Sequence, residues 1–121
     1  MREKRIEDLK KRMLNLLDQI NALGNHQLQV HQQRVTKEHL CFMGGNGRIW
    51  ITPCTAGYDI SLSGKSLENQ MYPFMRDLCG RECDGYKQTN ARLGRKDNPF
   101  WRVNDFELVK KAVFRYASTS A

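Results

Sequence analysis

Hydrophobic positions near the start of the chain recur with the period of a helix. Six apolar residues follow one another at alternating spacings of three and four, which places them on one helical face: Ile6, Leu9, Met13, Leu16, Ile20 and Leu23. A Gly-Asn pair at positions 24–25 supplies a helix end, because both residues tolerate the left-handed backbone conformation. The pattern predicts a long amphipathic helix over residues 1–24.

This apolar seam has two possible partners. Its strict heptad spacing is typical of a helix that pairs with a second copy, and it predicts a homo-oligomer assembled through the same six residues. Leu14 and Leu17 widen the seam toward the broader stripe with which a helix packs on a sheet of its own domain. Both alternatives remain open at the level of sequence.

From residue 27 onward the period changes from helical to alternating. Apolar residues then stand two positions apart, as in Leu40 and Phe42, Ile49 and Ile51, and Ile60 and Leu62. The glycine-rich segment 44–47 and the segment 53–57 are typical of tight reversals between strands. These features predict an antiparallel β-meander of three to four strands over residues 27–63.

The second half predicts two more helices around an irregular segment. A helical stretch covers residues 66–80 and ends at Gly80, and residues 81–100 form a basic loop without apolar periodicity. A strand and a C-terminal helix follow over residues 101–117, with Asn104 and Glu107 spaced as a capping box. Together the segments predict an α+β fold in one compact domain, residues 1–121.

Charge narrows the choice of partner. The chain has 20 Lys and Arg against 13 Asp and Glu, a formal net charge of +7, which favours anionic partners. No apolar run is long enough to span a membrane, and the basic N-terminus has no signal-peptide pattern, so we expect a cytoplasmic protein without a membrane partner. In that compartment the four cysteines are expected to be free thiols. The Cys79–Cys83 spacing is not that of a zinc knuckle, so no metal or cofactor is expected.

Motifs of catalysis are missing from the sequence. It has no phosphate-binding loop, no nucleophile elbow and no zinc-protease motif. Of the residues that a metal-dependent nuclease uses, only Asp59 and Lys65 stand at a suitable strand. The sequence therefore predicts a protein that is not an enzyme.

Binding chemistry concentrates in residues 86–103, YKQTNARLGRKDNPFWRV. Arginine forks and lysines in such a segment suit phosphate groups, and Tyr86 offers a ring for base stacking. The cations, opposed by one acid at position 97, are Lys87, Arg92, Arg95, Lys96 and Arg102. We predict a non-catalytic binding protein for phosphate-bearing ligands; in the alternative, Phe100 and Trp101 are core residues beside a solvated linker.

Three separated residues carry a resemblance to a known family. Arg48 opens a strand, Phe74 lies in a later helical segment and Arg102 lies near the last strand, and this order resembles the phage sponge proteins of the Thoeris anti-defence 1 family. The resemblance implies a small oligomer in the cytoplasm of an infected host cell. It also implies trapping of cyclic nucleotide or cyclic ADP-ribose immune signals between subunits, with no catalysis.

Three ligand classes therefore stay open. Nucleic acid would use Lys87, Arg92, Arg95, Lys96 and Arg102 to neutralise backbone phosphates. A small cyclic nucleotide would be clamped by Arg48 and Arg102 and stacked on Phe74 or Tyr86. An inhibitor or adaptor that docks on an acidic protein surface needs no pocket at all.

Overall fold

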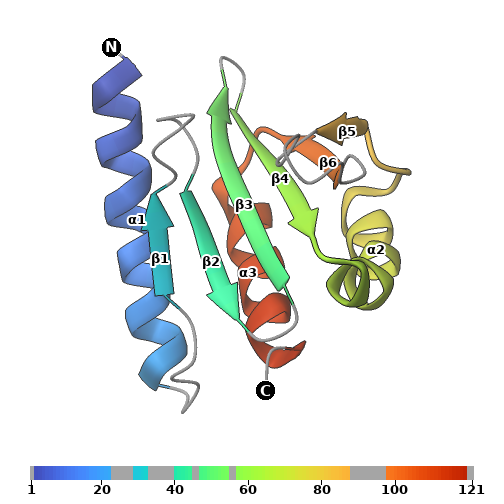
Figure 1. Ribbon diagram of the computed structural model, residues 1–121. Helices are drawn as coiled ribbons and strands as arrows, with labels where there is room; N and C mark the ends of the chain where they lie inside the picture. The colour runs from blue at the N-terminus through green and yellow to red at the C-terminus, as the bar shows by residue number, and fades with distance from the viewer. Residues whose placement is uncertain are drawn as a thin grey trace, which may run out of the picture.

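The computed structural model describes residues 2–22, 29–32, 40–44, 47–54, 57–87 and 98–119. This part of the chain forms three helices and six strands (Figure 1). In order they are α1 (Arg2–Ala22), β1 (Gln29–Gln32), β2 (Leu40–Gly44), β3 (Gly47–Cys54), β4 (Gly57–Ser63), α2 (Lys65–Cys79), β5 (Gly85–Lys87), β6 (Asn98–Val103) and α3 (Phe106–Thr119).

The strands form one antiparallel sheet in the order β1-β2-β3-β4-β6-β5. β1 to β4 pair with their sequence neighbours, so the predicted meander and the α+β fold are confirmed. After α2 the chain returns to the sheet, where β6 pairs with β4 and β5 becomes an edge strand.

The predicted loop over residues 81–100 was too long. Its first part contains β5, and its last residues already belong to β6, which begins at Asn98 rather than at residue 101. A strand of three residues is too short to show alternation, and the proline at position 99 obscures the start of the next strand. Both strands are stabilised by pairing with each other rather than by a local pattern.

One face of the sheet carries the apolar side chains and packs against the helices. On the three central strands these residues alternate strictly and are all buried: Ile49, Ile51, Ile60, Leu62, Trp101 and Val103. Buried residues from all three helices join them in a single core. Figure 1 shows α3 behind the sheet, with α1 near β1 and α2 on the side of β5. The chain is thus a two-layer structure with its helices gathered on one face.

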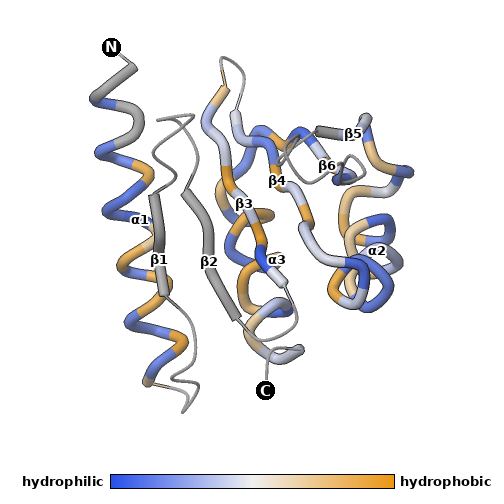
Figure 2. Tube along the Cα trace, viewed as in Figure 1, coloured by the Kyte–Doolittle hydropathy of each residue, from blue (hydrophilic) through white to orange (hydrophobic). Residues whose placement is uncertain are grey.

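The apolar seam of α1 belongs to this core. Leu9, Met13, Leu16 and Ile20 are buried among residues of the same chain, and Figure 2 shows hydrophobic positions recurring along the helix. These four residues therefore follow the alternative in which the helix packs on its own sheet. The side chain of Ile6 and the residue Leu23 lie outside the described part. A homo-oligomer remains a prediction, and assembly through this seam would require the core to open.

Glycine and aspartate set the helix ends. α2 ends as predicted at Gly80, which has a left-handed backbone with φ of 71°. The predicted capping box at the last helix was wrong by one residue, because the carboxylate of Asp105, not the amide of Asn104, accepts the bond from the Glu107 N–H at 3.0 Å. Asn104 still lies in the bend that leads out of β6.

Candidate functional site

The sheet has a second face, opposite the helices, that is polar and aromatic. Because side chains alternate along a strand, the positions between the core residues must point to this other side. The pairing register aligns them across strands, with Trp50 opposite Ser61, Ser61 opposite Phe100, and Asp59 opposite Arg102. We call this side of the sheet the polar face and define it by Arg48, Trp50, Thr52, Asp59, Ser61, Phe100 and Arg102. Of these residues, Trp50, Thr52, Asp59 and Ser61 are buried.

Two of the residues predicted to bind ligand, Arg48 and Arg102, share the polar face. Arg48 stands opposite Ser63, which lies four positions along β4 from Asp59, the partner of Arg102, so both arginines lie on the same side. At the edge of the sheet, Lys87 pairs with Asn98, four positions along β6 from Arg102. The register thus gathers Arg48 and Arg102 from two different strands.

The two predicted stacking residues lie elsewhere. Phe74 is on α2, in the helix layer. Tyr86 stands opposite Pro99, a position on the helix side of the sheet, although at the edge its side chain is largely exposed. Within one chain, Phe74 therefore does not form a common site with Arg48 and Arg102. Arg92, Arg95 and Lys96 lie outside the described residues.

Arg102 forms an ion pair with a buried carboxylate. Its Nε and Nη2 atoms donate to the two oxygens of Asp59 at 2.7 and 3.0 Å, and the Asp59 side chain is only 2% exposed whereas that of Arg102 is 54% exposed. These hydrogen bonds raise the pKa of Arg102 above its usual range. The guanidinium also lies 5.9 Å from the centre of the Phe100 ring. Arg102 is thus held in place before any ligand arrives.

This geometry predicts that removing Arg102 lowers stability most when the buried Asp59 keeps its charge. Replacing Arg102→Ala removes two donors from a buried carboxylate, and we expect a melting temperature several degrees lower. Adding Asp59→Asn to that variant should restore part of the loss, because the buried group then carries no charge. Thermal unfolding followed by circular dichroism measures both effects. An unchanged melting temperature for Arg102→Ala would show that Asp59 does not depend on this pair.

A second ion pair, between Arg81 and Asp84, lies where α2 leads into β5. Arg81 donates from Nε and Nη2 to the two oxygens of Asp84 at 3.0 and 2.9 Å, and Asp84 also accepts from the backbone N–H of Arg102 at 2.7 Å. Hydrogen bonding raises the pKa of Arg81 and lowers the pKa of Asp84. Through these hydrogen bonds, both side chains hold β6 against the segment after α2.

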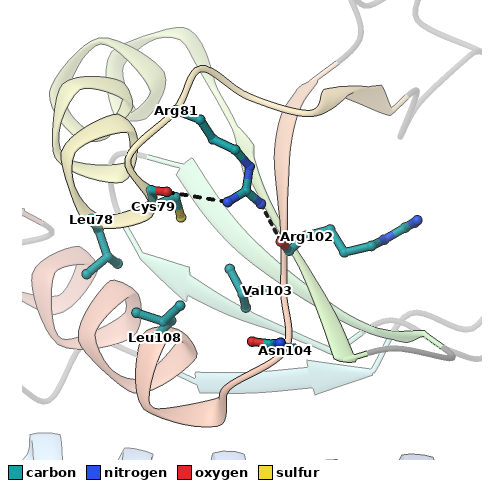
Figure 3. Close-up of a pocket in the computed structure, with 7 residues that line it drawn as sticks. All are labelled: Leu78, Cys79, Arg81, Arg102, Val103, Asn104 and Leu108. Carbon is teal, nitrogen blue, oxygen red and sulfur yellow. Dashed lines mark hydrogen bonds between the residues drawn. The ribbon is translucent and has the colours of Figure 1, made fainter.

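A small cavity of about 280 Å³ lies beside the Arg81–Asp84 ion pair (Figure 3). Figure 3 shows the Arg102 side chain pointing away from the other lining residues, while its backbone oxygen accepts a hydrogen bond from Arg81. Cys79 also lines the cavity, but burial raises the pKa of its thiol, which disfavours the reactive thiolate. The cavity shows no nucleophile and base arranged for catalysis.

Comparison with protein-family models, curated proteins and solved structures found no match to this chain. The site is therefore interpreted from its own residues. Within the described ranges no group of three or more His, Cys, Asp or Glu side chains gathers as metal ligands. None of the helices in these described ranges is long and apolar enough to cross a membrane.

Sequence reasoning missed a surface between α2 and α3. There Phe74 has a partner that was not foreseen, because the guanidinium of Arg115 lies 5.3 Å from the centre of its ring. Lys110, Lys111 and Phe114 line the same groove. A signal existed in the sequence, since Phe114 is an apolar residue among the basic positions of the last helix and stands one helical turn from Lys110 and Lys111.

Proposed function

We propose that this protein binds nucleic acid without altering it, through the polar face and the basic segment at its edge. The observation that supports this is the shared face of Arg48 and Arg102. The pair Lys87–Asn98 also closes the segment 88–97 at the edge of the sheet, so the chain that contains Arg92, Arg95 and Lys96 leaves and re-enters beside that face. A backbone of regularly spaced phosphates suits cations that are distributed in this way.

The spacing of the arginines supports an extended ligand. Arg48 and Arg102 stand opposite residues four positions apart on β4, a separation of about 13 Å along the strand, to which the steps between strands must be added. A single phosphate is much smaller than this distance, and Arg102 is already anchored to Asp59. Two phosphates of one strand of nucleic acid fit the two positions better than one shared phosphate.

One aromatic ring on the same face supplies a contact for bases. Phe100 is half-buried and lies on the same strand as Arg102, whereas Trp50, at the other end of the row through Ser61, is buried. Stacking of a base on an exposed ring contributes about 1–3 kcal/mol in proteins that bind single strands. Phe100 therefore takes the role that the sequence had assigned to Tyr86 or Phe74.

Oligonucleotide binding at two salt concentrations tests the proposal. If Arg48, Lys87, Arg92, Arg95, Lys96 and Arg102 each neutralise one phosphate, raising salt fourfold should weaken binding of a single strand roughly 300-fold. Replacing Arg92→Ala with Arg95→Ala should reduce the salt dependence by about a third and leave the melting temperature nearly unchanged. Fluorescence anisotropy of a labelled oligonucleotide measures the affinity.

The control is Lys10→Ala with Lys11→Ala, which removes the same charge from exposed positions on α1. Equal losses in both double variants would show that only net charge matters and would contradict a specific surface. A large loss of stability in the Arg92 and Arg95 variant would make the segment structural. A thermal shift with a cyclic nucleotide or an ADP-ribose derivative, without oligonucleotide binding, would favour the small-ligand alternative, in which Phe74 contributes between subunits.

A further inference from the structure

A groove of about 580 Å³ runs between α2 and α3 on the helix side of the molecule, away from the polar face. Its apolar lining comes from both helices, namely Phe74, Leu78 and Phe114, all only partly buried and packed against the core. Charged side chains surround this lining, and they are Glu107, Lys110, Lys111 and Arg115. The groove thus combines an apolar floor with a basic rim.

The cations of this rim are not neutralised by neighbouring acids. In the part of the chain that the structure describes, Lys110, Lys111 and Arg115 form no ion pair. Glu107 is the one acid among the lining residues, against three cations. Arg115 instead contacts the ring of Phe74, so its side chain is positioned over the floor, and Lys110 is half-buried at the rim.

We propose that this groove docks an acidic amphipathic segment of another protein. A helix in such a segment would place its leucine or phenylalanine side chains against Phe74, Leu78 and Phe114, and its carboxylates against the rim. The residues that line the groove extend from Phe74 to Leu78 on α2 and from Glu107 to Arg115 on α3, which is about 6 Å along the first helix and about 12 Å along the second. A helical segment of about two turns covers that length. This inference goes beyond nucleic-acid binding and concerns a separate surface.

Charge and chemistry favour this occupant over others. A second copy of the chain is a poor partner for a basic groove, because the chain itself has a net charge of +7. Nucleic acid would satisfy the rim but leaves the apolar floor without a matching side chain, and one face of the Phe74 ring is already covered by Arg115. Carboxylates together with apolar anchors satisfy the rim and the floor at once.

The test uses a labelled synthetic peptide of about 16 residues, long enough as a helix to follow the groove. It has leucines on one helical face and glutamates on the other, and its two controls are a scrambled peptide of equal composition and a peptide with leucine replaced by serine. We expect the full-length protein to bind the amphipathic peptide and to bind both controls about tenfold more weakly or less, because only the first presents anchors and charges together.

Variants locate the binding. Lys111→Glu with Arg115→Glu should weaken peptide binding about tenfold, since both changes reverse exposed rim charges. Lys10→Glu with Lys11→Glu on α1 is the matched control, with the same change in net charge, and it should have a much smaller effect. Oligonucleotide binding should be equal in these two variants, which separates this surface from the polar face. Circular dichroism verifies that each variant is folded, and the serine peptide tests the floor without any change to the protein.

Several results would overturn the proposal. These are equal binding of the amphipathic and scrambled peptides, equal losses in the two double variants, and no peptide binding at about 1 mM, the weak limit of specific recognition. Displacement of the peptide by a single-stranded oligonucleotide, with both losing affinity in the groove variant, would make the groove a nucleic-acid site. Binding of the wild-type protein to phosphatidylserine vesicles, lost in the same variant and without peptide binding, would make it a lipid site.

Discussion

Replacing Trp101→Ala should destabilise the protein by about 3–5 kcal/mol, the usual cost of removing a large buried ring. The indole is fully buried in the core, packs edge-to-face on Tyr72 at 4.9 Å and donates from Nε1 to the backbone oxygen of Arg81 at 3.1 Å. Domains of this size are stable by only about 5–15 kcal/mol, so the loss would leave many molecules near unfolding. Urea denaturation followed by circular dichroism measures the free energy of unfolding.

The control for this prediction is Trp101→Phe. Phenylalanine keeps a ring against Tyr72 but removes the hydrogen bond to Arg81, for which we expect a loss of about 1 kcal/mol, with a further small loss from the smaller ring. If Trp101→Ala were no more costly than Trp101→Phe, the indole would not hold β6 against the helices as the structure indicates.

Replacing Gly57→Ala should cost about 3 kcal/mol or more, because strain and overpacking combine at one position. Gly57 begins β4 with φ of 153°, and a Cβ atom there would lie 2.1 Å from the backbone oxygen of Val103 and 2.7 Å from the Cα of Asn104. Those atoms belong to the main chain at the end of β6 and cannot rotate away. β4 and β6 would have to separate, which urea denaturation would detect as a lower midpoint.

Gly80→Ala is the matched control. Gly80 also has a positive φ, 71°, but a Cβ there would have no atom within 4 Å, so only the backbone conformation is penalised, by about 1–2 kcal/mol. Equal losses at the two glycines would mean that the close approach of Gly57 to Val103 adds nothing, and that result would contradict the pairing of β4 with the end of β6.

Both changes act on the strand that positions the candidate site. β6 carries Phe100 and Arg102 on one face and Trp101 and Val103 on the other, so the core residues fix the depth and direction of the two residues on the polar face. Asp84 and Arg81 fix the same strand from the side of α2. Loss of oligonucleotide binding in either variant would therefore follow the loss of folded protein, whereas Arg92→Ala with Arg95→Ala should reduce binding in a folded protein.

Local patterns were sufficient for the elements with several turns or several alternations. The heptad seam of α1, the alternation of β3 and β4 and the glycine that ends α2 each depend on residues close together in sequence. β5 and the start of β6 escaped prediction because a short strand is stabilised by its neighbour, and no local period reveals that neighbour. The start of α3 differed by one residue because both Asn104 and Asp105 are good caps.

Local periodicity and side-chain chemistry were enough to predict the α+β class, the main elements and the types of residue suited to phosphate. Which of those residues lie together depends on how distant segments pack in the fold. Strand order and register place Arg48 and Arg102 on one face and join Arg102 to Asp59 across 43 positions, and helix packing brings Phe74 under Arg115 on another helix. An alternating pattern shows that a strand has two faces, but pairing with distant segments determines which residues from other strands share each face.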